Sequence, residues 1–215
     1  MRLVLIGPPG SGKGTQGKLL AERKQLCHFG MGDLVREAVR LGTPAGRVAG
    51  PYVQRGELVP DTIVNQMVAE RFTRLDRPAR FVMDGYPRTR GQAVAFDQVL
   101  LGQAVHLNGV VQLLVDDNEI VHRLSGRRSC PACNTPYHIL SKAPRITGIC
   151  DNDGVALVQR EDDREEIIRE RLRVYHHNNA DLLRYYRERG LLRTVSGQGG
   201  IEAIYQNILR ALDSG

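Results

Sequence analysis

The apolar positions of this 215-residue chain fall into short continuous runs separated by stretches with helical periodicity. Residues 2–6 form one such run, and residues 81–84 and 110–115 form two more. Uninterrupted apolar runs of this length are typical of strands buried on both faces of a sheet. Residues 191–195 are a further, less apolar strand candidate.

Each of these strand candidates is followed by a segment with the period of a helix. The first helix is predicted over 15–24, and the last over 201–212. A long charged segment, 164–189, is either one helix or two pieces divided at Asn178, Asn179 and Ala180. Strands that alternate with helices indicate an α/β fold with a parallel, doubly wound sheet.

Two stretches interrupt the alternation of strands and helices. Residues 30–59 show helical patterns, including 33–41, with no strand between them. Residues 126–163 contain three cysteines and three prolines and have no long period of either kind. We expect both to be insertions into a core made of residues 1–29, 60–125 and 164–215.

Composition and charge exclude few classes of protein. Hydrophobic residues make up 41% of the chain and charged residues 25%, as in ordinary globular proteins. No apolar run approaches the roughly 20 residues that span a bilayer, and the first run is too short for a signal peptide. We therefore expect a cytoplasmic protein with no membrane partner. The net charge of +6 indicates either a polyanionic ligand or an arginine-rich surface.

A glycine-rich segment between the first strand and the first helix carries the clearest chemistry. It runs from Gly7 to Thr15 and has the pattern of a phosphate-binding loop. Backbone N–H groups and the start of a helix would bind an anion there, and the lysine would reach the outer phosphates. The candidate phosphate-binding residues are Gly10, Ser11, Gly12, Lys13, Gly14 and Thr15.

The loop has the variant pattern GxPGxGKGT. Together with the segment from Asp84 to Thr89, this pattern narrows the class of phosphate-binding protein to which the chain is similar. The chain resembles the adenylate kinases and related nucleoside monophosphate kinases over essentially its whole length. The resemblance implies a P-loop core with a nucleoside-monophosphate-binding insertion at 30–59 and a lid at 126–163. It implies reversible, Mg²⁺-dependent phosphoryl transfer from ATP to AMP, giving two ADP, by a monomeric transferase of nucleotide biosynthesis. No nucleic-acid partner is expected.

The resemblance also implies which residues bind the acceptor nucleotide. Arg36 and Arg88 match arginines that bind its phosphate, and Gln92 matches the side chain that pairs with adenine. The family usually has Ser or Thr before Gly32, whereas this chain has Met31, which cannot donate a hydrogen bond to the base. The full AMP-binding set is Met31, Arg36, Glu57, Leu58, Val59, Gly85, Tyr86, Pro87, Arg88, Gln92, Arg160 and Arg171.

On the donor side, the resemblance implies that Arg123 stacks on the adenine of ATP and that Arg127 contacts its phosphates. Pro136, Tyr137 and Gly199 complete the expected ATP site with the phosphate loop. Asp84, at the end of a strand, is expected to hold Mg²⁺ through coordinated waters. The expected catalytic residues are Lys13, Asp84, Arg88, Arg127, Arg160 and Arg171.

The reaction itself explains this concentration of positive charge. Two nucleotides bring several phosphates together, and their repulsion must be neutralised before an in-line transfer. Because the acceptor is a phosphate with a second pKa of about 6, it is already ionised and needs no catalytic base. A lid that closes would exclude water, which competes as acceptor. Asp162 and Asp163 lie where the lid meets the core, or else cap a helix.

The remaining cysteine pattern predicts a metal site in the lid. Cys130, Cys133, Cys150 and Asp153 have the two-knuckle spacing of structural zinc, and members of the family with a zinc lid share it. A redox pair or unmetallated thiols are alternatives, and Asp151 or His138 could replace Asp153. Cys27, near the end of a helical pattern, is expected to be a small buried hydrophobe.

Two other functions compete with ATP:AMP transfer. A related kinase that uses UMP or CMP as acceptor, or GTP as donor, would keep the same chemistry. A zinc-ribbon nucleic-acid-binding module is the alternative from another class, since Arg127, Arg128, Lys142 and Arg145 lie near the cysteines. That alternative leaves the phosphate loop unexplained.

Overall fold

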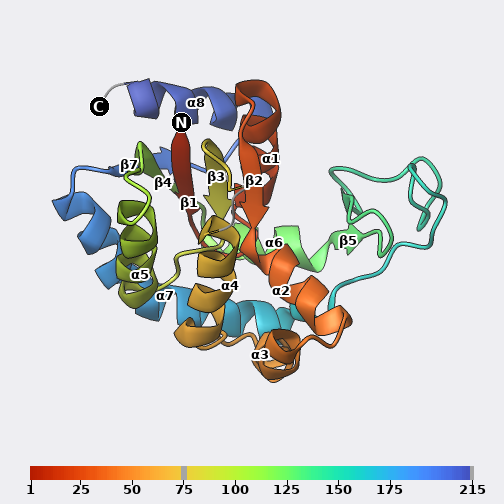
Figure 1. The fold of residues 1–215 in the computed structure, drawn as a ribbon. Coiled ribbons are helices and arrows are strands. Elements are labelled where there is room, and N and C mark those ends of the chain that lie inside the picture. Colours follow the sequence, from red (N-terminus) through yellow and green to blue (C-terminus); the bar gives the residue numbers. More distant parts are fainter. Residues whose placement is uncertain (74–76, 214–215) are drawn as a thin grey trace.

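The computed structural model describes residues 1–73 and 77–213. Its centre is a parallel sheet with the strand order β2-β3-β1-β4-β7 (Figure 1). Strands are paired in parallel register, for example Leu3 with Val82 on one side and with Gly109 on the other. The strands are β1 (Arg2–Ile6), β2 (Cys27–Gly30), β3 (Phe81–Asp84), β4 (Gly109–Leu114) and β7 (Leu192–Ser196).

The helices cover both faces of this sheet, so the predicted doubly wound α/β fold is confirmed. Figure 1 shows α1 and α8 beside one face, whereas α4, α5 and α7 lie beside the other. The helices are α1 (Lys13–Lys24), α2 (Met31–Arg40), α3 (Pro44–Arg55), α4 (Asp61–Thr73), α5 (Arg90–Leu101), α6 (Asp117–Ser125), α7 (Glu165–Glu188) and α8 (Ile201–Asp213).

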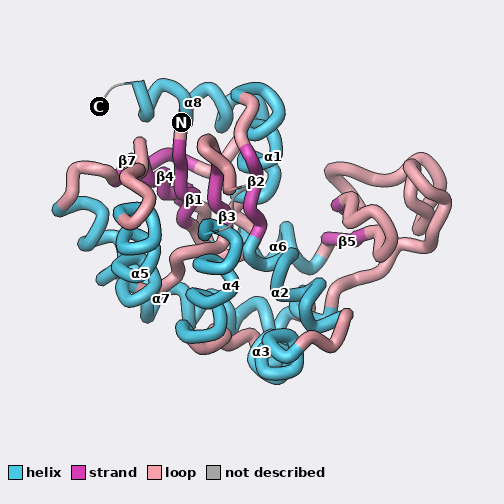
Figure 2. Tube along the Cα trace, in the orientation of Figure 1, coloured by secondary structure: helices cyan, strands magenta, loops and turns pink. Residues whose placement is uncertain are grey.

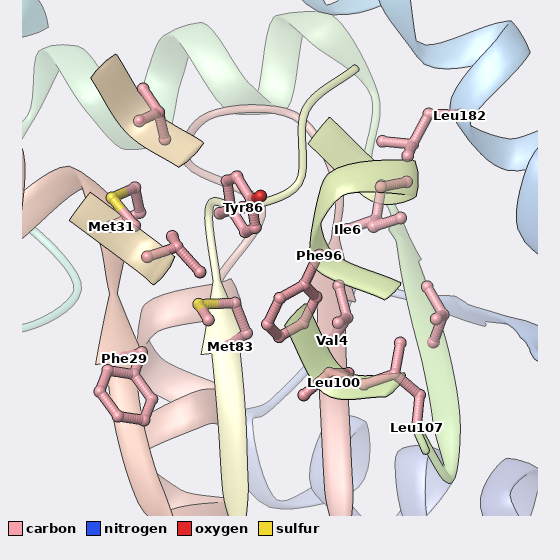
Figure 3. Close-up of a cluster of buried hydrophobic side chains, with 14 of the residues drawn as sticks. Val4, Ile6, Phe29, Met31, Met83, Tyr86, Phe96, Leu100, Leu107 and Leu182 are labelled. Carbon is pink, nitrogen blue, oxygen red and sulfur yellow. The ribbon is translucent and has the colours of Figure 1, made fainter. Parts of the chain in front are cut away.

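Strand β1 shows why its sequence is apolar throughout. Leu3 and Leu5 point into a cluster with residues of α1 and α8, such as Leu20 and Ile208. Val4 and Ile6 belong to the other cluster, which includes Phe96 (Figure 3). Because successive strand side chains alternate between faces, a strand covered on both sides needs apolar residues at every position.

Strand β2 was not predicted from the sequence. Cys27, expected near the end of a helix, instead lies in this strand and is half-buried, because α1 ends at Lys24. The segment Cys27–Gly30 is short, and its His28 and Gly30 give no apolar run. Its strand conformation depends on pairing with β3, from Cys27 beside Phe81 to Gly30 beside Asp84.

The long segment after the lid forms one helix rather than two pieces. Helix α7 continues through Asn178, whose side-chain amide donates to the carbonyl of Val174 at 2.9 Å. Leu182 and Tyr186 on the later turns are buried against the sheet, which keeps the helix aligned past the polar stretch. Tertiary packing therefore decides its continuity.

Residues 126–163 project from the rest of the molecule and consist mostly of loops (Figure 2). Strands β5 (Arg127–Ser129) and β6 (Pro136–His138) form a small antiparallel pair near their start. A short 3-10 helix, η1 (Glu161–Asp163), leads into α7. Among the described residues, no helix has both the length and the hydropathy required to cross a bilayer.

Candidate active site

The phosphate loop connects β1 to α1 at the carboxyl edge of the sheet. Gly10 and Gly12 have φ of 76° and 93°, a region that favours glycine, and Gly12 is the N-cap of α1. The Lys13 ammonium donates to the carbonyl oxygens of Gly7 at 2.8 Å and Pro8 at 2.7 Å. Helix start, loop amides and lysine therefore meet at one point, as an anion site requires.

Burial lowers the pKa of Lys13 to about 8, and the carboxylate of Asp84 partly opposes this shift. The positive charges of Arg88, Arg171 and Arg127 add to the lowering. Cations from three separate segments therefore act on the Lys13 ammonium group. Such mutual repulsion among cations is expected where a polyanion binds.

Asp84 ends β3, next to β1, which carries the loop. A Cβ built at Gly14 would lie only 3.2 Å from Oδ2 of Asp84, so the carboxylate borders the loop directly. Thr15 lies in the first turn of α1 and is exposed. A carboxylate beside a phosphate loop offers the hard oxygen ligands that Mg²⁺ prefers.

A cavity beside the loop contains most of the residues expected to bind the acceptor. From the predicted set, it is lined by Met31, Arg36, Glu57, Leu58, Val59, Gly85, Arg88, Gln92 and Arg171. Val35, Val53, Val64 and Asp162, which were not predicted for this site, also line it. The mixture of an apolar wall and convergent cations suits a nucleotide with a base and a phosphate.

Tyr86, Pro87 and Arg160 are not in the lining of this cavity. Tyr86 is buried among the apolar side chains of the core (Figure 3), and its hydroxyl donates to Asn65 at 2.8 Å. Arg160 lies near Arg36 and Arg127, and burial with these two charges lowers its pKa to about 10. It therefore stays protonated at neutral pH.

Two buried aspartates hold several of the expected phosphate-binding arginines. Asp162 accepts from Arg171 at 2.9 Å and lies 3.6 Å from Arg36. Asp163 accepts from Arg127 through two nitrogens. Burial acts to raise the pKa of Asp162, but the arginines, Arg171 first, hold it below its ordinary value. From the sequence, this pair was expected at the junction of lid and core or as a helix cap, because burial cannot be read from an acidic tripeptide.

Comparison with known proteins identifies the family to which the chain belongs. The sequence matches the protein family described as Adenylate kinase over residues 5–191. The chain belongs to the adenylate kinase family. It is 45% identical to an adenylate kinase of Syntrophotalea carbinolica over 215 residues, covering 100% of both chains. An adenylate kinase of Citrifermentans bemidjiense is 45% identical over 212 residues, with 99% of both chains covered.

A third relative, an adenylate kinase of Acholeplasma laidlawii, is 41% identical over 99% of this chain and 98% of its own. The predicted resemblance is therefore confirmed. Adenylate kinases transfer a phosphoryl group between ATP and AMP and use Mg²⁺ with ATP. As a member of the family, this chain is an enzyme of that class, and no finding favours the UMP, CMP, GTP or nucleic-acid alternatives.

The residues expected to bind the adenine of ATP lie close to the phosphate loop, since a Cβ built at Gly197 would be 3.2 Å from the carbonyl oxygen of Ser11. Arg123 donates to Glu119 at 2.7 Å and to the carbonyl of Gly197 at 3.2 Å. Gly199 follows in the same loop with φ of 106°. These contacts bring the end of α6 to the turn between β7 and α8, two segments far apart in the sequence.

Pro136 and Tyr137 lie instead in β6 of the lid. The Tyr137 ring is buried in a small lid cluster with Cys130 and Cys150. Its hydroxyl accepts from the backbone N–H of Asp151 at 2.8 Å. The Tyr137 side chain is therefore occupied inside the lid, and its expected contact with ATP stays a prediction.

The four predicted metal ligands come together in the lid. One ligand atom from each of Cys130, Cys133, Cys150 and Asp153 lies within 4.8 Å of the others. The Sγ atoms of Cys133 and Cys150 are 3.6 Å apart, and Asp153 approaches Cys130 Sγ to 3.2 Å. A tetrahedral ion with bonds of about 2.0–2.3 Å has ligand–ligand separations of about 3.5–3.8 Å, close to these values.

The two rival fourth ligands have other partners. Asp151 accepts from the backbone N–H of Arg145 at 2.8 Å. His138 Nδ1 accepts from the backbone N–H groups of Leu140 and Ser141, both at 3.1 Å. The geometry therefore supports a metal-binding set of three thiols and the Asp153 carboxylate.

Proposed function

We propose that the phosphates of both nucleotides bind where the phosphate loop meets the arginine-lined cavity, and that phosphoryl transfer occurs between them. The main support for this proposal is that four cations from separate segments lie near the ends of β1 and β3: Lys13, Arg36, Arg88 and Arg171. Donor phosphates would lie on the loop and acceptor phosphate among the arginines. Positioning and charge neutralisation then account for catalysis.

In this proposal, the loop amides and Lys13 hold the donor phosphates, and the negative charge displaces the lysine from its contacts with Gly7 and Pro8. Arg36, Arg88 and Arg171 bind the acceptor phosphate, for which the planar guanidinium is suited. Mg²⁺, held near Asp84, would supply further charge neutralisation. No residue is assigned as a base because the acceptor oxygen is already ionised.

The aspartates at the base of the lid fit this proposal as temporary counter-ions. Asp162 and Asp163 neutralise Arg171 and Arg127, two half-buried arginines. Arriving phosphates would compete for the same guanidinium groups. Exchange of carboxylate for phosphate would couple nucleotide binding to movement of the lid, with residues 30–59 and 126–163 as the moving parts.

We further propose that the metal of the lid is Zn²⁺ and that its role is structural. Three thiolates favour zinc over harder ions, and four protein ligands leave no open position for chemistry. We also propose that the enzyme is a cytoplasmic monomer. Light scattering on the purified protein tests the oligomeric state.

Acceptor choice is the sharpest test of the proposed function. ADP formation from ATP and AMP with Mg²⁺ is measured beside UMP and CMP as acceptors and GTP as donor. We expect kcat/KM to be highest for ATP with AMP, because Gln92 at the cavity wall can pair with adenine. Comparable rates with UMP would overturn the acceptor assignment, whereas slow transfer to every acceptor would overturn the site.

A further inference from the structure

The Gln92 side chain, 2% exposed on the first turn of α5, is held at both ends of its amide. Its Oε1 accepts from the backbone N–H of Arg88 at 2.7 Å. Its Nε2 donates to Oδ1 of Asp61 at 2.7 Å. The other carboxylate oxygen of Asp61 accepts from the Thr89 hydroxyl, also at 2.7 Å. Asp61 is therefore fixed while it holds the amide.

These two partners permit only one orientation of the amide. A carboxylate can only accept hydrogen bonds, and a backbone N–H can only donate. A flipped Gln92 would place its NH₂ group against the N–H of Arg88 and its oxygen against Asp61. Both contacts would then be repulsive. The hydrogen bonds to Arg88 and Asp61 therefore determine which end of the amide is Oε1 and which is Nε2.

Gln92 is also the uncharged polar side chain in the described lining of the cavity. The apolar wall includes Met31 and Val59, and Met31 has no hydrogen to donate to a base. The Glu57 carboxylate is paired with Arg55 through two hydrogen bonds. Polar side-chain discrimination of the base therefore depends on the amide of Gln92.

We propose that Asp61 is a positioning residue that selects 6-aminopurine acceptors over 6-oxopurine acceptors. After its contacts with Asp61 and Arg88, the amide retains one N–H and one lone pair. Adenine presents a donor at its 6-amino group and an acceptor at N1, which complement them. A 6-oxopurine presents an acceptor and a donor in the reverse order. This inference rests on the proposed function, in which Gln92 faces the acceptor base.

The test compares kcat/KM for AMP and inosine monophosphate in the wild type and in Asp61→Asn. The new carboxamide can donate as well as accept, so it no longer requires the donor end of Gln92, and only the Arg88 N–H still favours the original orientation. We expect the AMP-to-inosine-monophosphate ratio of kcat/KM to fall by about tenfold or more, as expected for the gain or loss of a buried hydrogen bond. The change should appear mainly in KM, since the transferring phosphates are untouched.

Asp117→Asn is the matched control. Asp117 is likewise a first-turn aspartate, of α6, and its exposed carboxylate contacts His176. The AMP-to-inosine-monophosphate ratio of kcat/KM in this variant should equal that of the wild type. If Asp61→Asn lowers kcat/KM for both acceptors in proportion, Asp61 only supports the structure and the proposal is overturned. A wild-type ratio near one would overturn it without any variant.

Gln92→Leu separates this proposal from the function on which it rests. If that variant leaves the AMP-to-inosine-monophosphate ratio of kcat/KM unchanged, Gln92 does not contact the acceptor base. The proposed position of the acceptor base is then wrong. If Gln92→Leu lowers the ratio and Asp61→Asn does not, the site stands and the role of Asp61 is overturned. Should Asp61→Asn not fold, Asp61→Ser, whose hydroxyl also donates and accepts, is measured with the same expected fall and the same contrary result.

Discussion

The sheet core and the lid of this enzyme are held together by different means. In the core, Phe29, Phe72, Phe81 and Phe96 contact one another at ring-centroid distances of 5.0–6.5 Å within a large apolar cluster. In the lid, the buried cluster consists of Cys130, Tyr137 and Cys150, with Leu157 packed against it. Apolar lid residues such as Leu140 and Ile146 are 72% and 67% exposed.

The difference follows from size. A lid of mostly irregular backbone buries too little apolar surface to offset the entropy of ordering its chain. Metal ligation can supply the missing free energy. The core, by contrast, is stable enough to hold Lys13 in surroundings that lower its pKa. One region therefore provides fixed charge, and in the proposed function the other provides a cover that moves.

The largest effect should come from the charge that the core holds. Lys13→Met removes the ammonium group at the phosphate loop, and we expect kcat/KM to fall by about 10³-fold or more. Steady-state kinetics with ATP and AMP measure it. Lys18→Met, at an exposed position of the same helix, is the control and should retain activity. A loss below tenfold for Lys13→Met would contradict the proposed role.

Next in size is the stability of the core. Phe96 is fully buried, and Phe96→Ala should lower the free energy of unfolding by about 3–5 kcal/mol through lost burial and a cavity. Ile146→Ala in the lid should change it by less than about 0.5 kcal/mol, since that side chain is largely exposed. Urea unfolding compares the two variants. Equal losses of unfolding free energy in the two variants would contradict the proposed difference between core and lid.

The lid should depend on its metal. We expect about one zinc per chain in the wild type and none in Cys133→Ser, with faster amide exchange across residues 126–163 and about tenfold lower kcat/KM for ATP. Cys27→Ser, in β2, should retain the metal. Elemental analysis and hydrogen exchange provide the measurements, and an undisturbed lid in metal-free protein would show that zinc is not what holds it.

The smallest effect concerns pH. Bound phosphates should raise the Lys13 pKa from about 8, so ATP binding above that pH must take up a proton. From this pKa, the protonated fraction of free enzyme falls about threefold between pH 7.5 and 8.5, and ATP affinity should fall with it. Titration calorimetry in buffers of different ionisation enthalpy detects the proton. Proton release on ATP binding, or no proton exchange, would contradict this prediction.

Much of the fold could be predicted from local patterns. Strand β3 spans the predicted 81–84, and β1 the predicted 2–6, because strands buried on both faces must be apolar throughout. Strand β2 could not be predicted, since His28 and Gly30 interrupt any apolar run and only β3 makes the segment a strand. The polar stretch at Asn178 likewise gave no sign that later packing keeps α7 whole.

The sequence alone determined the chemistry available to this enzyme: the glycine-rich loop with Lys13, the cysteine spacing and the arginines in family motifs. Tertiary structure decided which of these groups meet. The pairing of Asp162 with Arg36, the pairing of Asp163 with Arg127, and the Asp61 contact that orients Gln92 join segments about 30 or more residues apart. Motifs report residue types at short spacing, whereas charge pairing and hydrogen-bond direction depend on distances that only the folded chain sets.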